Sequence, residues 1–302
     1  MKYLFWTLLV LLILYLLALR GRSGHPGLAK LRGWNYTHRG LHGNGLPENS
    51  LAAFRAGVEK GYGSEFDVHL LRDGGLAVVH DSKLLRTTGL PGRVEDLTTA
   101  ELKNCFLEGT TETIPTLQEV LAVYSGKAPI IVELKPEGGN HAALCEAACA
   151  AMEGFEGAWC MESFDPRVVY WLRKNRPEII RGQLAENSLR NPDSKLPLVL
   201  KLLLTFHLEN FVCRPDFIAY DFGTRKVLSN AICRKLWGLE AVTWTLRTPE
   251  DHATAVKEGW IPIFENYLPK SKPKAVQALL PALPFHMKGG NPHVKSQRNR
   301  HH

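Results

Sequence analysis

The chain has 302 residues, of which 45% are hydrophobic and 22% are charged. This composition excludes an intrinsically disordered chain and predicts a globular protein with a large buried core. The length suits one α/β barrel of roughly 250 residues with a short extra segment, or two small domains. The formal net charge is +7, but no helix-turn-helix, zinc-finger or RNA-binding signature is present. We therefore expect no nucleic-acid partner, and an anionic lipid surface is the simpler explanation of the charge.

The chain begins with a long apolar segment. Residues 3–19 read YLFWTLLVLLILYLLAL, without charge, glycine or proline. At ~1.5 Å per residue this run spans about 25 Å, slightly less than a bilayer core of ~30 Å. A cleaved signal peptide is the alternative, but Arg20 and Arg22 follow the run in place of a small-residue cleavage site. The sequence thus predicts an uncleaved transmembrane anchor over residues 1–20. Basic residues are more numerous after the segment than before it, which predicts a single-pass membrane protein whose main domain is cytoplasmic.

The remaining elements alternate between strands and helices. Residues 21–33 are rich in Gly and Arg and are interpreted as a linker. The strands expected next are Trp34–Thr37, Ser64–His69, Ile130–Glu133, Gly157–Glu162, Ile179–Gln183, Phe217–Tyr220, Ala241–Trp244 and Trp260–Phe264. The helices expected after them are Ser50–Lys60, Thr116–Tyr124, His141–Met152, Pro166–Asn175, Leu196–Leu208, Arg225–Trp237, Pro249–Glu258 and Lys270–Leu279. Eight strand–helix units predict an α/β fold of the TIM (β/α)8 barrel type over residues 34–285.

Two segments lie outside this alternation. Residues 71–115 form an insertion after the second strand, with a hairpin expected at Asp73-Gly74-Gly75. Residues 286–302 are basic and polar, and they are predicted to be a disordered tail. The six cysteines include no CxxC pair and are interpreted as buried structural thiols, so that no disulfide is required.

Acidic residues gather where the second and third strands are expected to end. Glu65 and Asp67 are two apart and therefore point to the same face of a strand, and Glu133 lies on the neighbouring strand. Several carboxylates facing into a barrel need a cation. Oxygen ligands without cysteine favour a hard ion, Mg²⁺ or Ca²⁺. The alternative is that Glu65 and Asp67 form salt bridges with Arg39 and Lys135.

Two histidines stand at comparable positions. His38 and His80 each follow an apolar run that is typical of a strand, and a charged residue follows each of them. Imidazole exchanges protons near neutral pH. A pair of them beside a carboxylate cluster therefore indicates general acid–base chemistry.

The spacing of these residues resembles that of the glycerophosphodiester phosphodiesterase family. The matching segments are His38-Arg39-Gly40, Pro47-Glu48-Asn49-Ser50, Ala53-Phe54, Ala56-Gly57, Glu65-Phe66-Asp67-Val68, Leu71-Arg72-Asp73-Gly74, Val78-Val79-His80-Asp81, Val132-Glu133-Leu134-Lys135, Ser163-Phe164-Asp165 and Trp244-Thr245. They occur in order over most of residues 34–268. The resemblance implies a TIM barrel with a small insertion after the second strand.

The resemblance also assigns roles to these residues. Glu65, Asp67 and Glu133 would bind the divalent ion, and His38 and His80 would be the acid–base pair. Arg39, Lys135 and Trp244 would contact the substrate, while Glu48 would lie beside the metal or orient His38. The implied reaction is hydrolysis of glycerophosphodiesters to glycerol phosphate and an alcohol.

The sequence departs from the family pattern late in the chain. Leu246-Arg247 replaces the usual Val-Asn, and Ile261-Pro262-Ile263-Phe264-Glu265-Asn266 replaces Gly-Ile-x-Thr-Asp. These loops shape the substrate side, so the leaving group stays open. A lysophospholipase D acting on lysophospholipids is one alternative, favoured by the apolar stretch Leu196–Leu208. A catalytically inactive, membrane-tethered binding barrel is the other.

Overall fold

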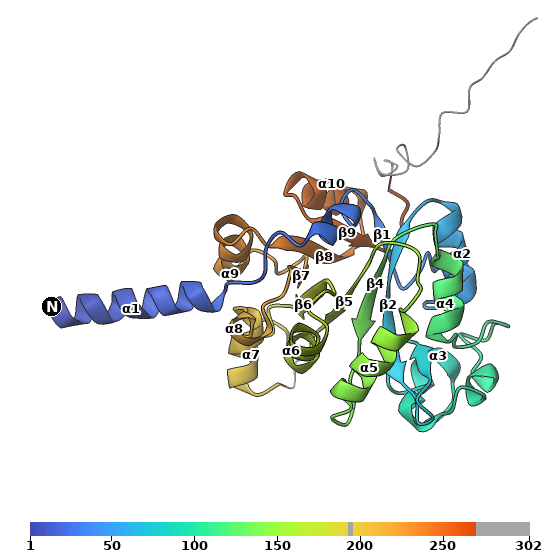
Figure 1. The fold of residues 1–302 in the computed structure, drawn as a ribbon. Coiled ribbons are helices and arrows are strands. Elements are labelled where there is room, and N and C mark those ends of the chain that lie inside the picture. Colours follow the sequence, from blue (N-terminus) through green and yellow to red (C-terminus); the bar gives the residue numbers. More distant parts are fainter. Residues whose placement is uncertain (193–195, 270–302) are drawn as a thin grey trace, which may run out of the picture.

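The computed structural model describes residues 1–192 and 196–269 of the chain. Eight parallel strands close into a barrel, because β1 pairs with both β2 and β9 and the order around the barrel is β1-β9-β8-β7-β6-β5-β4-β2 (Figure 1). Their bounds are β1 (Tyr36–His38), β2 (Gly63–Leu70), β4 (Ile130–Leu134), β5 (Trp159–Ser163), β6 (Arg181–Ala185), β7 (Phe217–Asp221), β8 (Glu240–Leu246) and β9 (Ile261–Phe264). The strands are buried almost throughout, as expected for parallel strands covered by helices. The predicted TIM barrel is confirmed.

Helices surround the barrel (Figure 1). They are α2 (Leu51–Glu59), α4 (Leu117–Tyr124), α5 (His141–Ala151), α6 (Pro166–Asn175), α7 (Leu198–Thr205), α8 (Asn210–Cys213), α9 (Leu228–Ala231) and α10 (Pro249–Lys257). Four of them begin at a side chain that accepts a hydrogen bond from a backbone N–H of the first turn, namely Ser50, Thr116, Asp165 and Thr248. The helix predicted over residues 225–237 is instead divided into α9 and a π-helical segment, η4 (Ile232–Leu236). The helix predicted over 270–279 and the predicted tail lie outside the described residues.

The insertion after β2 packs around a small apolar core of its own. β3 (Leu76–Val78) runs antiparallel to β2, and the turn between them places Gly74 at φ +85°, a conformation that favours glycine. The predicted hairpin at Asp73-Gly74-Gly75 is thus confirmed. A short helix, α3 (Leu85–Thr88), and two 3₁₀ turns, η2 (Val94–Asp96) and η3 (Glu101–Asn104), complete the insertion. Its core includes Leu71, Leu84, Val94, Leu102 and Ile114.

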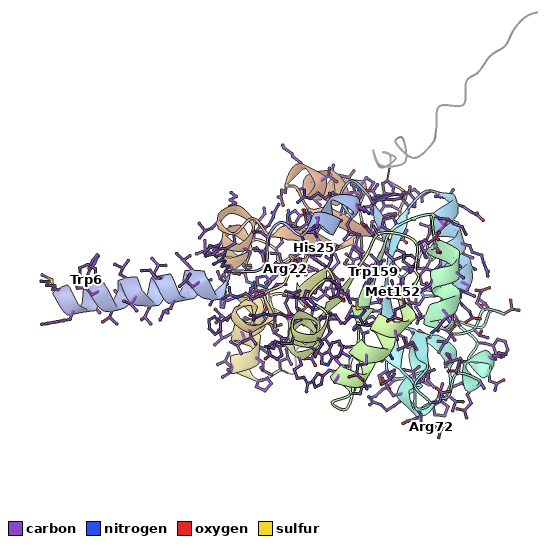
Figure 2. The ribbon with its side chains drawn as sticks, in the orientation of Figure 1. Trp6, Arg22, His25, Arg72, Met152 and Trp159 are labelled. Atoms are coloured by element: carbon purple, nitrogen blue, oxygen red, sulfur yellow. The ribbon has the colours of Figure 1, made fainter. Side chains whose placement is uncertain are left out.

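The N-terminal helix α1 (Lys2–Ala18) projects away from the barrel (Figure 1). No residue of α1 is buried, and Trp6 points into solvent near its free end (Figure 2). Among the described residues, no helix combines the length and the apolar character needed to cross a membrane. The predicted transmembrane anchor is therefore not supported.

The segment after α1 packs against the barrel, although its composition indicated a linker. Leu28 and Leu31 belong to the main apolar core, and Pro26–Lys30 form a 3₁₀ turn, η1. Three backbone carbonyls at the end of α1 also accept hydrogen bonds from the barrel. The bonds run from Trp237 Nε1 to Leu16 at 2.8 Å, from Arg214 Nη1 to Leu17 at 3.3 Å and from Asn210 Nδ2 to Leu19 at 3.3 Å.

Candidate active site

Three buried carboxylates meet inside the barrel near the carboxyl ends of its strands. Glu65 and Asp67 lie on β2 and Glu133 lies on β4, and the parallel register places Asp67 opposite Glu133. One oxygen of each carboxylate lies within 4.8 Å of the others. All three residues are less than a tenth exposed. The structure thus brings together the three residues that the sequence predicted to share a cation.

Two cationic side chains neighbour this acidic cluster. Lys135 Nζ donates to Asp67 Oδ1 at 3.2 Å and to Glu133 Oε1 at 3.0 Å, and Arg39 Nε lies 3.5 Å from Asp67 Oδ2. The salt bridges considered as an alternative are therefore present for Asp67, and Lys135 pairs with Glu133 as well. They leave Glu65 Oε2 buried, with no hydrogen-bond partner among the described residues.

The pKa values of the three carboxyls diverge. Burial, together with repulsion by Asp67 and Glu133, raises the pKa of Glu65 well above its usual range. Burial also raises the pKa of Glu133, to about 7, although Lys135 opposes this shift. For Asp67, burial alone would raise the pKa, but Lys135 and nearby cations hold it well below the usual value. An oxygen-only cluster that holds protons for lack of positive charge fits a hard divalent cation.

His38 lies between a second carboxylate and the acidic cluster. It closes β1, and its Nδ1 is 2.6 Å from Glu265 Oε2, just after β9. Its Nε2 is 3.9 Å from Glu65 Oε2. Burial lowers the pKa of His38, while the hydrogen bond to Glu265 acts in the opposite direction. The ring is therefore held by Glu265 at one nitrogen and faces the cluster with the other.

His80 has a similar arrangement. It follows β3, and its Nδ1 is 2.6 Å from Asp81 Oδ1. Burial is the main cause that lowers the pKa of His80 to about 4. Lys135 and Arg39 act in the same direction, and Asp67 opposes them. Near pH 7 this imidazole is neutral and can accept a proton.

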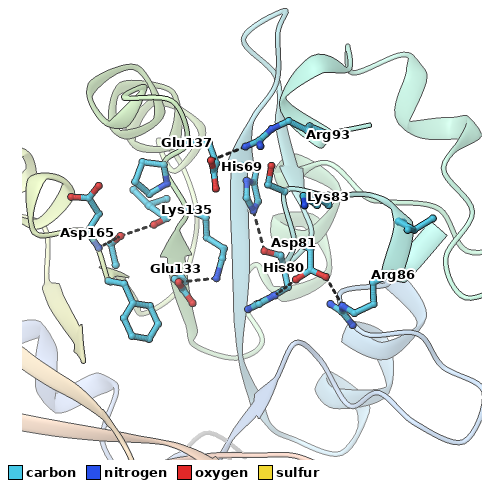
Figure 3. Close-up of a pocket in the computed structure, with 16 residues that line it drawn as sticks. His69, His80, Asp81, Lys83, Arg86, Arg93, Glu133, Lys135, Glu137 and Asp165 are labelled. Atoms are coloured by element: carbon cyan, nitrogen blue, oxygen red, sulfur yellow. Dashed lines mark hydrogen bonds and ion pairs between the residues drawn. The ribbon is translucent and has the colours of Figure 1, made fainter. Parts of the chain in front are cut away.

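Two cavities connect these groups. A crevice of about 50 Å³ is lined by both imidazoles, by two of the three carboxylates and by the rings of Phe164 and Trp244. Beside it lies a cavity of about 710 Å³, which shares His80, Glu133 and Phe164 with the crevice and is also lined by Lys135. Figure 3 shows Glu133 and Lys135 on one side of this cavity and His80 on the other. The arrangement offers proton-transfer groups, cations and a candidate metal site around one small space.

Residues 38–268 match the model of the Glycerophosphoryl diester phosphodiesterase family. The chain belongs to this family. A glycerophosphodiester phosphodiesterase of Caldanaerobacter subterraneus subsp. tengcongensis is 30% identical over 232 residues, which cover 74% of this chain and 89% of that protein. The rat protein named Lysophospholipase D GDPD1 is 36% identical over 112 residues, covering 33% of this chain and 35% of that one.

Solved structures agree with this membership. An Oleispira antarctica phosphodiesterase in complex with the product sn-glycerol-3-phosphate has a TM-score of 0.65 and 25% identity, and the match covers 85% of this chain and 98% of the other. The protein is therefore a phosphoric diester hydrolase, as the sequence predicted.

Glu48 of this phosphodiesterase lies among arginines. Its Oε1 accepts from Arg39 Nη1 at 3.0 Å and from Arg86 Nη2 at 2.6 Å. Burial raises the pKa of Glu48, but the two guanidinium groups outweigh it and lower the pKa overall. Glu48 thus positions Arg39, and the carboxylate that touches His38 is Glu265 instead.

Three residues of the phosphodiesterase site received no role in the sequence analysis. Asn49 donates from Nδ2 to Asp67 Oδ2 at 3.0 Å. Glu162 lies opposite Glu133 in the β4–β5 register, and its Oε2 is buried with no hydrogen-bond partner in the described part of the chain. Burial and the nearby Glu133 raise the pKa of Glu162 well above its usual range. The sequence could have indicated Glu162 as a site residue, because it lies near the carboxyl end of a predicted strand.

The third residue, Glu265, links the two places where this phosphodiesterase departs from the family pattern. Arg247 Nε donates to Glu265 Oε1 at 2.7 Å, and His42 Nε2 lies 3.5 Å from Glu265 Oε2. These contacts with His38 and His42 lower the pKa of Glu265 despite its burial. The sequence could have indicated Glu265 as a site residue, because it is the first residue after the predicted eighth strand.

Proposed function

We propose that the enzyme hydrolyses glycerophosphodiesters to glycerol phosphate and an alcohol, with a bound divalent ion and with His38 and His80 as the acid–base pair. The names of the Caldanaerobacter and Oleispira relatives support this substrate class. The observation that carries the proposal is the acidic cluster. Its three carboxylates lie within 4.8 Å of one another, and two of them, Glu65 and Glu133, line the crevice together with both imidazoles.

Glu65, Asp67 and Glu133 would hold the ion, and their oxygen ligands favour Mg²⁺ or Ca²⁺. Such an ion polarises the phosphoryl oxygens and lowers the pKa of an attacking hydroxyl. Two observations support a bound cation. Glu65 Oε2 has no hydrogen-bond partner among the described residues, and the pKa of Glu133 is raised. Both are expected of a cluster that needs more positive charge than Lys135 and Arg39 supply.

The histidines would move the protons. A carboxylate occupies Nδ1 of each ring, which leaves Nε2 to exchange a proton with the substrate. One ring removes a proton from the nucleophile, and the other protonates the departing alkoxide. Both rings have lowered pKa values, so the ring that acts as the base is neutral and accepts a proton at Nε2. The ring that acts as the acid would take up its proton at Nε2 together with the anionic substrate, whose charge raises the pKa of a neighbouring imidazole, and would then donate that proton to the alkoxide.

The cations beside the cluster would bind the phosphate. Arg39 and Lys135 both lie against Asp67, at the edge of the crevice where the anionic group would sit. Glu48 holds the Arg39 guanidinium in this position. Trp244, whose ring packs against Phe164 with 5.5 Å between centroids, would form the wall against the organic part of the substrate.

The test is a hydrolysis assay with glycerophosphocholine at increasing Mg²⁺ or Ca²⁺ concentration. Glu133→Gln should lower kcat/KM by at least about 100-fold, since even partners one step removed from a metal ligand are worth 10–100-fold. Glu137→Gln is the matched control, because Glu137 lines the same large cavity but its carboxylate pairs with Arg93. Full turnover in the presence of a chelator, or equal loss in both variants, would contradict the proposal.

A second candidate reaction is hydrolysis of lysophospholipids. The rat relative carries the name Lysophospholipase D. The specific observation that favours it is a second large cavity, mainly apolar, that shares Phe164 and Asp165 with the cavity beside the crevice.

A further inference from the structure

We infer that this apolar cavity binds the acyl chain of a lysophospholipid while the phosphodiester lies in the crevice. The inference rests on the proposed function, because it adds a subsite to that reaction. The cavity has a volume of about 730 Å³, within the range of ~300–1,000 Å³ that is usual for small-ligand sites.

Leucines form one wall of the cavity. Leu196 precedes α7, and Leu200, Leu203 and Leu204 come from α7 itself. Leu200 is 42% exposed, which is a large exposed fraction for a leucine. An apolar ligand in the cavity would remove this surface from water and would gain the corresponding hydrophobic free energy.

The cavity adjoins the active site at one turn. Phe164 and Asp165 follow β5 and line both this cavity and the 710 Å³ cavity, and Phe164 also lines the crevice. α7 follows β6, so the segment between them leaves the barrel at the same end as the catalytic residues. A chain attached to the glycerol of a substrate in the crevice would therefore meet the leucines after passing Phe164.

The charges in the wall argue against a cationic headgroup as the occupant. Three acidic side chains line the cavity, and two of them have a close partner: Asp165 with Arg167 at 2.6 Å and Glu186 with Asn191 at 2.7 Å. The third, Glu209, lies 3.4 Å from His207 Nδ1, and its carboxylate oxygens have no hydrogen-bond partner among the described residues. Burial also raises the pKa of Glu209, which disfavours its charged form. A choline or ethanolamine group would find two carboxylates that are already engaged and a third whose charged form is disfavoured, whereas an acyl chain needs only the apolar walls.

The experiment compares glycerophosphocholine with 1-acyl-glycerophosphocholines of about four to ten carbons, kept below their micellar concentrations. For the unmodified protein, kcat/KM should rise with chain length, by at most roughly fourfold per buried methylene. Leu200→Asp should abolish this rise and lower kcat/KM at least about tenfold on the longest substrate. On glycerophosphocholine the same variant should stay within about twofold. Leu198→Asp is the matched control, because Leu198 is an exposed leucine of α7 that does not line the cavity.

Each other result would overturn the inference. If kcat/KM of the unmodified protein does not change with acyl-chain length while glycerophosphocholine is hydrolysed normally, the subsite is refuted and the proposed function stays intact. An unchanged rise in Leu200→Asp would refute it as well, and Leu200→Gln serves if the charged variant does not fold. An equal loss on glycerophosphocholine would assign the cavity to the choline group instead.

Absence of turnover on every substrate would mean that the proposed function fails. Calorimetric binding of the longest 1-acyl-glycerophosphocholine then decides the inference alone. Binding that is at least about tenfold weaker in Leu200→Asp supports the acyl site. No binding, or equal binding by both proteins, refutes it.

Discussion

Replacing Glu265 by glutamine tests the contact that holds His38. Glutamine keeps the size of the side chain, and its oxygen can still accept a hydrogen bond from Nδ1, so the change mainly removes the charge. Both partners are largely buried, with side-chain exposures of 14% for His38 and 9% for Glu265, so solvent screens the interaction little. A hydrogen bond to a charged group is worth about 1.5–3 kcal/mol, which corresponds to roughly one to two units in the pKa of the imidazole.

The expected result is a fall of roughly 10- to 100-fold in kcat/KM on glycerophosphocholine. Glu265 raises the pKa of His38, so its removal should move the limb of the pH profile that reports His38 toward lower pH. A shift of the ascending limb identifies His38 as the base, and a shift of the descending limb identifies it as the acid.

Arg247→Gln provides the control for this variant. Arg247 contacts the other oxygen of the same carboxylate, but its side chain is 62% exposed, and exposed ion pairs contribute only ~0–1 kcal/mol. Its kcat/KM should therefore change by no more than a few-fold. A Glu265→Gln protein of normal thermal stability, with the pH profile and kcat/KM of the unmodified enzyme, would refute a positioning role for Glu265.

Three further predictions concern acid–base chemistry, the metal site and stability. His80→Ala should lower kcat by ~10²–10⁴-fold on a glycerophosphodiester; a much smaller loss on an activated aryl phosphodiester identifies His80 as the acid, and an unchanged kcat contradicts its role. The pKa of Glu133 is raised to about 7 in the folded state, so its stabilising contribution is complete below the ordinary carboxyl pKa and is lost as pH rises through about 7. Without metal, Tm should therefore fall between about pH 5 and 8, and Mg²⁺ should raise Tm more at pH 8 than at pH 6; an increment independent of pH would count against the metal site. Asp216→Asn should cost about 2–3 kcal/mol and lower Tm by roughly 4–12 °C without changing kcat, because the buried carboxylate accepts from Arg22 and from the backbone N–H of Arg181; an unchanged Tm would contradict this.

The barrel itself was predictable because its signals are local. Most strands are short runs rich in apolar residues, and the eight runs predicted from the sequence agree with the observed strands to within two residues at either end. The helix expected over residues 196–208 is shorter, since α7 starts after Pro197 and His207 has a positive φ of 56°. Leu28 and Leu31 show the limit of composition as a guide, because two leucines in a Gly- and Arg-rich stretch pack into the main apolar core.

Some residues of the candidate site could likewise be predicted from the sequence, and others could not. Glu65 and Asp67 could be paired from their spacing on one strand, and Glu133 follows from the strand order of a barrel. The partner of His38 could not be found in this way, because Glu265 lies 227 positions away and only closure of the sheet between β1 and β9 brings the two together. Glu48, which is close to His38 in sequence, was the natural expectation, but two arginines hold it elsewhere.

The hydrogen bonds at the base of α1 have a mechanical consequence. The three donors come from segments before and after β7 in the sequence: Asn210 and Arg214 precede β7, and Trp237 follows it. Each donates a hydrogen bond to a backbone carbonyl at the end of α1. A helix fastened at three carbonyls cannot rotate about a single flexible bond. We therefore expect α1 and the barrel to move together, so that anything bound to α1 would also set the direction in which the mouth of the barrel faces.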